Sequence, residues 1–213
     1  MAEERFDIYD EQLNHLGTAT RAETHARGYW HRTFHCWLTR RDGDRRLVRF
    51  QLRQAGKDTN PGCYDITAAG HLAAGETMRE AVRELEEELG VKAAFEQLIP
   101  LGQIREDASG IVNGKPFIDR EVSDIFGLVC DLPLEELRLQ PEEVAGVYEA
   151  DLDELIAVFE GLRPEAEADG VELSAADGTL TPATRRVRAS QFVPRDPSYY
   201  ADFLRKLRGC TQV

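Results

Sequence analysis

The sequence predicts an α/β (α+β) fold in one domain that spans residues 1–213, and two patterns support this prediction. Several segments bounded by Gly, Pro, Asn or Asp alternate apolar and polar residues or form short apolar runs, which is typical of β-strands. Other segments repeat apolar residues every three or four positions, which is typical of amphipathic helices. We find no internal repeat and no convincing second domain. The chain divides into an N-terminal extension (1–31), a core (32–160), and a surface excursion with a C-terminal helix (161–213).

Residues 5–21 alternate around a turn-like centre, so we expect a β-hairpin ahead of the core. Such a hairpin could serve a homodimer. The next stretch carries His25, His31 and His35 and runs into a strand from about Thr33 to Leu38. Clustered histidines can ligate a transition metal, but His31 and His35 are four residues apart in a partly extended segment and need not converge. Packing and hydrogen bonding are therefore the preferred interpretation of these histidines.

A second strand, residues 47–52, leads into a loop that carries two cations, Arg53 and Lys57. A guanidinium group and an ammonium group together make a reasonable clamp for a diphosphate. Without other evidence, such a pair of cations is more often solvent-exposed and has no functional role. A short apolar strand from Tyr64 to Ala69 then leads to Gly70.

The segment from Thr77 to Gly90 is predicted as a helix. Thr77 and Glu80 have the Thr-x-x-Glu spacing of a capping box, and Gly90 supplies the C-terminal stop. One face of this helix is an apolar stripe that packs on the protein. The stripe consists of Met78, Ala81, Val82, Leu85 and Leu89.

Glu84, Glu87 and Glu88 stand at i, i+3 and i+4, so their side chains share one face of the same helix. Like charges at this spacing destabilise a bare helix by a few tenths of a kcal/mol per pair, so a cluster that faces a cleft calls for a cation. Carboxylate oxygens suit Mg²⁺ or Mn²⁺. A solvated acidic face is the alternative.

Beyond this helix, strands are expected at 93–102 and 115–130, and a helix that begins with acidic residues is expected at 151–159. Residues 161–190 change from acidic and small to basic, and we interpret them as a surface excursion. A terminal helix from about Pro197 to Leu207 should pack through its apolar face. That face consists of Tyr199, Tyr200, Phe203 and Leu204.

Composition narrows the classes of partner. With 39 acidic and 26 basic residues, the net charge of −13 disfavours a nucleic acid polymer but permits a small phosphorylated molecule held through a metal. We find no transmembrane stretch and no signal peptide, so a cytoplasmic protein without a membrane partner is expected. The four cysteines are scattered and are interpreted as free thiols.

Residues 70–91 resemble the Nudix box, in which Gly, five residues and Glu are followed by seven residues and then Arg-Glu-aliphatic-x-Glu-Glu-x-Gly-aliphatic. The matching positions are Gly70, Glu76, Arg83, Glu84, Leu85, Glu87, Glu88, Gly90 and Val91. Six residues rather than seven separate Glu76 from Arg83. This difference puts the placement of Glu76 in doubt and leaves the helical carboxylates in register.

The resemblance implies a Nudix fold, in which a mixed sheet lies between helices, and a hydrolase that cuts diphosphates with Mg²⁺ or Mn²⁺. It assigns the metal to Glu84, Glu87 and Glu88. Glu87 or Glu143 would then orient or deprotonate the attacking water. Catalytic Arg83 would pair with a glutamate rather than touch the substrate.

The flanks of the box resemble the isopentenyl-diphosphate isomerase branch of the Nudix superfamily. In that branch a metal is held partly by histidines that match His25, His31 and His71, and residues that match Arg53 and Lys57 grip the diphosphate. Gly70 and His71 are accordingly expected at the substrate.

The catalytic cysteine of those isomerases precedes this Gly-His pair, and Ala69 occupies that position here. Alanine cannot protonate carbon, so the sequence favours a diphosphate hydrolase in an isomerase-like frame. An isomerase and a non-catalytic nucleotide-binding sensor remain as alternatives.

Overall fold

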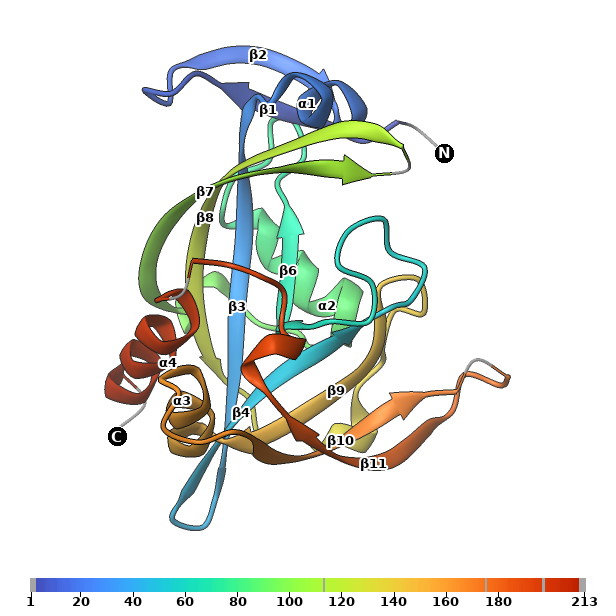
Figure 1. Ribbon diagram of the computed structural model, residues 1–213, viewed down its shortest axis with the longest axis vertical. Helices are drawn as coiled ribbons and strands as arrows, with labels where there is room; N and C mark the ends of the chain where they lie inside the picture. The colour runs from blue at the N-terminus through green and yellow to red at the C-terminus, as the bar shows by residue number, and fades with distance from the viewer. Residues whose placement is uncertain (1–2, 113, 175, 197, 211–213) are drawn as a thin grey trace.

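The computed structural model describes residues 3–112, 114–174, 176–196 and 198–210, and these form a mixed α+β structure, which confirms the predicted fold class (Figure 1). One sheet runs in the order β11-β10-β9-β4-β3-β1-β2, while β5 pairs with β4, β6 and β8 pair with β3, and β7 pairs with β8. The strands are β1 (Arg5–Tyr9), β2 (His15–Thr20), β3 (Trp30–Asp42), β4 (Arg45–Arg53), β5 (Tyr64–Ile66), β6 (Ala68–His71), β7 (Ile99–Val112), β8 (Lys115–Val129), β9 (Val144–Asp151), β10 (Ala166–Leu173) and β11 (Leu180–Val187). The α-helices are α1 (Arg21–Arg27), α2 (Arg83–Leu89), α3 (Leu152–Phe159) and α4 (Tyr199–Cys210).

Strand β3 is the centre of the fold because both of its faces are buried. Phe34, Cys36 and Leu38 belong to a core cluster that also contains residues of α2. Trp37 points to the opposite face, into a cluster formed with α3 and α4. The sheet therefore has helices on both sides, and burial of each Phe or Leu side chain in such a core stabilises the fold by about 1.5–3 kcal/mol.

The predicted N-terminal hairpin is confirmed as β1 and β2, which pair in antiparallel fashion. Helix α1, which follows it, was not predicted. Thr20 caps this helix in a reciprocal capping box with Glu23, and Gly28 ends it in the left-handed conformation. Thr20-x-x-Glu23 followed by Gly28 is the sequence signal that identifies this short helix.

The box helix is shorter than predicted. A 3-10 turn covers Glu80–Val82, and regular α-helix begins only at Arg83. The Glu80 carboxylate accepts hydrogen bonds from the backbone N–H and the hydroxyl of Thr77, at 2.9 and 2.8 Å. Gly90 ends the helix in the left-handed conformation, as predicted.

Two strand predictions differ from the structure. The strand predicted at 93–102 begins only at Ile99, because residues 95–97 form a 3-10 turn, and β7 then continues to Val112 against β8. Residues 161–190, predicted as a surface excursion, instead contain β10 and β11, and β10 pairs with β9. The inward residues of β10 include Ala166 and Ala168, whose small side chains give a weak apolar signal although they are buried.

The last two helices agree with the prediction. Asp151 caps α3 by accepting hydrogen bonds from the backbone N–H groups of Asp153 and Glu154. The four predicted apolar residues of α4 are all buried, whereas the predicted start at Pro197 lies outside the described residues. Within the described part of the chain, no helix has the length and apolar character needed to cross a membrane.

Candidate active site

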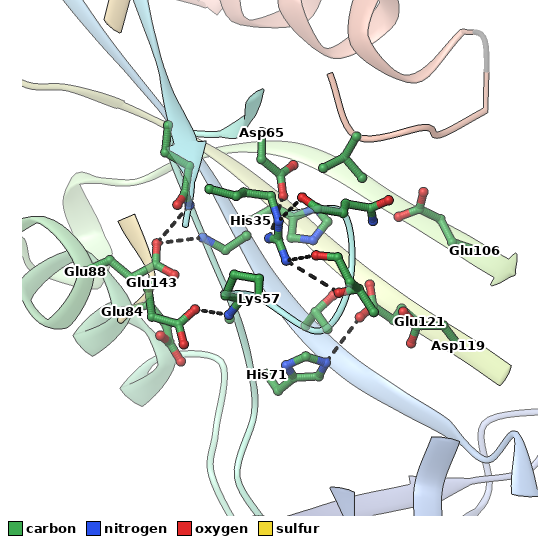
Figure 2. A pocket seen from close by; sticks show the side chains of 18 of the residues that line it. His35, Lys57, Asp65, His71, Glu84, Glu88, Glu106, Asp119, Glu121 and Glu143 are labelled. Carbon is green, nitrogen blue, oxygen red and sulfur yellow. Dashed lines mark hydrogen bonds and ion pairs between the residues drawn. The ribbon is translucent and has the colours of Figure 1, made fainter. Parts of the chain in front are cut away.

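A cleft of about 360 Å³ lies between α2, the loop after β4 and the β7–β8 hairpin (Figure 2). Nine residues that the sequence assigned to catalysis, to the carboxylate metal site or to substrate binding line this cleft. They are Arg53, Lys57, Gly70, His71, Arg83, Glu84, Glu87, Glu88 and Glu143. The fold therefore brings together side chains from segments that are far apart in the sequence.

Helix α2 points two of its glutamates toward the sheet. Glu84 and Glu88 are buried next to Leu85 and Leu89, which pack into the core. One oxygen of Glu88 accepts hydrogen bonds from Gln51 Nε2 at 3.2 Å and from the backbone N–H of Ala69 at 3.3 Å. Because these donors come from β4 and β6, the sheet itself fixes the carboxylate of Glu88.

Glu84 lies directly against Gly70 of β6. A Cβ atom built on Gly70 would lie 2.5 Å or less from the oxygens of the Glu84 carboxylate. Any larger residue at position 70 would therefore displace this carboxylate. The glycine that opens the box is needed for close approach of the helix rather than for an unusual backbone conformation.

Of the two buried carboxylates, Glu84 shares the Arg83 guanidinium with other glutamates, and Glu88 forms no ion pair within the described part of the chain. Burial raises the pKa of Glu84 to about 7, and burial together with the nearby Glu84 charge raises the pKa of Glu88 well above its ordinary value. Arg83 contacts Glu84 at 2.8 Å and also pairs with the half-exposed Glu87. Two buried hard oxygen donors with raised pKa values suit a divalent cation such as Mg²⁺ or Mn²⁺.

Arg83 is held mainly by Glu76. Its Nε and Nη2 atoms lie 2.6 and 3.0 Å from the two carboxylate oxygens of Glu76, and Nη2 also donates to the carbonyl of His71 at 3.3 Å. This agrees with the expectation that Arg83 pairs with a glutamate. Glu76, whose placement the shortened loop left in doubt, thus fixes the entry to α2.

Arg53 and Lys57 both face the cleft but have partners in the protein. Arg53 donates to Asp65 at 3.0 Å and to the carbonyls of Thr59 and Asn60 at 3.0 and 3.2 Å, so it organises the loop 54–63. Lys57 forms an ion pair with Glu143. A phosphate group in the cleft would therefore compete with Glu143 for Lys57.

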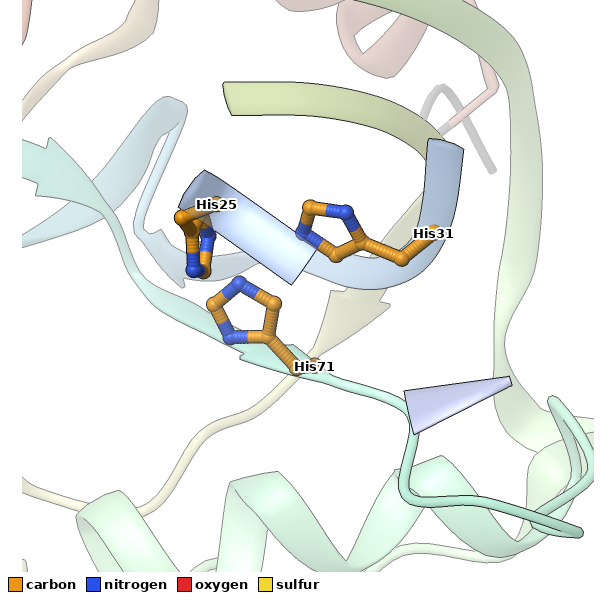
Figure 3. Close-up of side chains that lie close together, drawn as sticks. All are labelled: His25, His31 and His71. Atoms are coloured by element: carbon orange, nitrogen blue, oxygen red, sulfur yellow. The ribbon is translucent and has the colours of Figure 1, made fainter. Parts of the chain in front are cut away.

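His25, His31 and His71 form a second potential ligand set, and one ring nitrogen from each lies within 4.8 Å of the others (Figure 3). Packing alone is therefore an incomplete interpretation of His25 and His31, and the three histidines are the set that the resemblance to the isomerase branch implied. His35 also lines the cleft but is not part of this set, and it contacts the Tyr199 hydroxyl at 3.0 Å. His31 also groups with Asp119 and Glu121 of β8. Among the described residues, Glu84, Glu87 and Glu88 do not converge as tightly.

The histidine cluster has the properties of a metal site. The Nε2 atoms of His31 and His71 are buried and form no hydrogen bond in the described part of the chain, and both face the Glu121 carboxylate, at 3.8 and 3.3 Å. Burial lowers the pKa of His31 to about 4 and also lowers the pKa of His71, so both rings are neutral near pH 7, as ligation requires. Phe6 of the N-terminal hairpin stacks on both rings, at centroid distances of 5.3 and 4.8 Å.

Three further cleft residues were missed by the sequence analysis. Arg21 lies 3.1 Å from Glu4 and 3.4 Å from His71 Nδ1, and the same capping box that predicts α1 would have placed it. Arg195 and Glu106 form an ion pair that lines the cleft. No local pattern marks these two, because they lie 89 positions apart in the chain.

Comparison with known proteins agrees with this architecture. A Clostridium acetobutylicum protein described as an uncharacterized Nudix hydrolase is 36% identical over 207 residues, which cover 97% of this chain and 98% of that protein. An isopentenyl-diphosphate Delta-isomerase of Clavibacter michiganensis is 33% identical over 153 residues, covering 70% of this chain and 73% of the isomerase.

Nudix hydrolase 3 of Arabidopsis thaliana is 39% identical over 69% of this chain and only 19% of its own length. The solved structure of DR0079 from Deinococcus radiodurans has a TM-score of 0.55 and 20% identity, over 74% of this chain and 90% of that one, and supports the fold. The NUDIX domain pattern matches residues 29–173. The chain therefore belongs to the NUDIX domain family.

Proposed function

We propose that this chain hydrolyses a diphosphate linkage in a small phosphorylated metabolite, either a nucleoside di- or triphosphate or another organic diphosphate. The observation that carries this proposal is the composition of one cleft. Buried carboxylates of α2 line one side of it, and Lys57 and Arg53 approach from the loop after β4. A diphosphate needs both features, because its charge must be neutralised while water attacks phosphorus.

Glu84, Glu87 and Glu88 would hold Mg²⁺ or Mn²⁺ in this proposal. A bound divalent cation neutralises phosphate charge and lowers the pKa of water. Gln51 and the Ala69 N–H keep Glu88 in place, and Gly70 leaves room for Glu84. The protein thus preorganises the carboxylates before the substrate arrives.

Glu143 or Glu87 would take the proton of the attacking water. The carboxylate of Glu143 is about one third exposed at the cleft and pairs with Lys57. When Lys57 turns to a phosphate oxygen, Glu143 becomes free to accept a proton. Glu87 keeps its ion pair with Arg83 on the neighbouring turn of α2.

Isomerisation of a prenyl diphosphate is the second candidate, and the histidine cluster favours it, because the resemblance to the isomerase branch assigns a metal to His25, His31 and His71. Ala69 opposes it. Its side chain offers no proton donor at the position that carries the isomerase cysteine, and its N–H is committed to Glu88.

The test is turnover of a mixed panel of nucleotide, sugar and prenyl diphosphates with Mg²⁺ or Mn²⁺, following phosphate release and loss of substrate. We expect one class to be hydrolysed and Glu87→Gln to lower the rate by at least about a hundredfold. Glu86→Gln is the matched control, because Glu86 lies on the same helix, outside the cleft, in an exposed pair with Lys92.

Rearrangement of a prenyl diphosphate without phosphate release would support the isomerase instead. Binding of a nucleotide without turnover by the unmodified chain would indicate the non-catalytic sensor. Equal rates for the two glutamine variants would exclude Glu87 from the chemistry.

A further inference from the structure

The loop that joins β6 to α2 has little packing of its own. It covers residues 72–77, and Ala73, Ala74 and Gly75 in its middle are all exposed. The loop also borders a second cavity of about 250 Å³, so part of it lacks a packed neighbour. Because small exposed side chains bury little apolar surface, hydrogen bonds must fix the position of this loop.

The N-terminal hairpin supplies two of these hydrogen bonds. After β6 the chain runs up to the hairpin before it returns to α2 (Figure 1). The Arg5 carbonyl of β1 accepts from the N–H of Ala74 at 2.8 Å, and Asp7 Oδ2 accepts from the N–H of Gly75 at 2.9 Å. Gly75 has a φ angle of +80°, which favours glycine. Asp7 therefore holds the residue at which the loop turns.

The carboxylate of Asp7 is itself held in place. Its Oδ1 atom lies 3.1 Å from His15 Nε2 of β2, and its side chain is only 24% exposed. The preceding residue, Phe6, stacks on the rings of His31 and His71. Because successive residues of a strand point to opposite faces, β1 contacts the histidine cluster through Phe6 and the loop through Asp7.

From Gly75 the contacts continue to the glutamates of α2. Glu76 follows Gly75 and accepts hydrogen bonds from the N–H of Ala73 at 2.7 Å and from Arg83 at 2.6 and 3.0 Å. Arg83 in turn lies 2.8 Å from Glu84 Oε1. A shift of Gly75 would therefore move Glu76, and with it the guanidinium group beside Glu84.

The start of α2 depends on these contacts because it lacks a cap. Only six residues separate Glu76 from Arg83, and a 3-10 turn at Glu80–Val82 precedes the regular helix. No side-chain cap hydrogen bond forms at Val82, the residue before α2. The pair between Glu76 and Arg83 therefore takes over the task of fixing the first turn of the helix.

We propose that Asp7 is a positioning residue for the metal-binding carboxylates. By accepting from the N–H of Gly75 it fixes Glu76 and Arg83, and thereby the carboxylate of Glu84. This inference rests on the proposed function for the metal and the reaction. Asp7 is not among the described residues that line the active-site cleft, so it acts through the loop and makes no contact with the substrate.

The test is Asp7→Ala with two readouts, the affinity for Mn²⁺ measured by electron paramagnetic resonance without substrate, and hydrolysis of the diphosphate at saturating Mg²⁺. Glu84→Gln identifies the part of the Mn²⁺ signal that belongs to the α2 glutamates. Residues that orient metal ligands typically contribute about 10- to 100-fold to affinity or activity. Since Asp7 acts through two further residues, we expect about a tenfold loss of Mn²⁺ affinity and of kcat, with KM changed by less than about twofold.

Two variants separate positioning from stability of the hairpin. Asp10 accepts from the N–H groups of Gln12 and Asn14 in the turn of the same hairpin, at 2.9 and 2.8 Å. Asp10→Ala should therefore lower the melting temperature but change neither readout. Asp7→Asn keeps an oxygen that can accept from Gly75 and should stay within about threefold of the unmodified chain in both readouts.

If Asp7→Ala does not fold, Asp7→Glu, whose longer side chain cannot place its carboxylate at the same point, should give the same selective loss. Unchanged Mn²⁺ affinity and kcat in Asp7→Ala, equal losses in Asp7→Ala and Asp10→Ala, or no recovery in Asp7→Asn would overturn the proposal.

The Mn²⁺ readout separates this inference from the proposed function, since it needs no turnover. A selective loss of Mn²⁺ affinity in Asp7→Ala, with no diphosphate hydrolysed by the unmodified chain, would retain the role of Asp7 and remove the hydrolase. Hydrolysis that Asp7→Ala and Asp10→Ala leave equally intact would do the reverse.

Discussion

Replacement of Gly70 by alanine tests whether the α2 carboxylates are placed for catalysis. The new Cβ would lie 2.5 Å from Glu84 Oε2, whereas ordinary contacts of this kind begin near 3.4 Å. Glu84 must therefore move by roughly 1 Å, and a displacement of that size at a catalytic group can reduce the rate about a hundredfold. We expect Gly70→Ala to lose about this factor in kcat for diphosphate hydrolysis.

The assay for Gly70→Ala is phosphate release in Mg²⁺, accompanied by thermal unfolding to show that the protein remains folded. Gly110→Ala is the matched control, because a Cβ at Gly110 meets nothing within 4 Å and this residue lies outside the cleft. A Gly70→Ala protein with nearly unchanged kcat would refute the reasoning, since Glu84 would then tolerate displacement.

Two further predictions concern stability. Arg53→Met should lower the free energy of unfolding, measured by urea titration, by about 3 kcal/mol, because it leaves Asp65 and two loop carbonyls without this donor. The control is Arg45→Met, at an exposed ion pair, which should change the free energy of unfolding by less than about 0.5 kcal/mol. Similar losses in the two variants would contradict the structural role of Arg53. His35 is fully buried, and burial holds its pKa well below the ordinary value of 6.5, so its neutral form stabilises the fold above that pH and this contribution is lost as pH falls. Between pH 6.5 and 5 the unfolding free energy of the unmodified chain should therefore fall more steeply than that of His35→Gln, by up to about 1.4 kcal/mol per pH unit, and parallel curves would exclude His35 as the cause.

Local signals made much of the site predictable. The glycine stop at Gly90 and the i, i+3, i+4 spacing of the glutamates depend only on neighbouring residues, and the structure retains both. Their environment depends on distant residues and could not be predicted. Gln51, which holds Glu88, lies 37 positions earlier in the chain. The predicted charged face of α2 is accordingly divided, because Glu88 is buried while Glu87 is about half exposed.

The histidines show the same limit at longer range. His25 comes from α1, His31 from β3 and His71 from the end of β6, and only the antiparallel pairing of β3 with β6 brings the last two together. Residue spacing gave no reason for His31 and His35 to converge, and only the resemblance to the isomerase branch grouped His31 with His25 and His71. A ligand pair that is set by strand register cannot be derived from residue spacing unless the partner strand is known.

Ala69 lies close to residues of both potential ligand sets, the α2 glutamates and the histidines, and its identity helps to distinguish hydrolysis from isomerisation. It lies in β6, the strand that pairs with β3, directly before Gly70, which accommodates Glu84. A side chain with an acidic proton at this position would face substrate carbon in an isomerase. Here the contribution of residue 69 is its backbone N–H, which donates to Glu88 at 3.3 Å. Because a hydrogen bond to a carboxylate favours its charged form, this position supports a glutamate that can bind a cation, which is the requirement of a hydrolase.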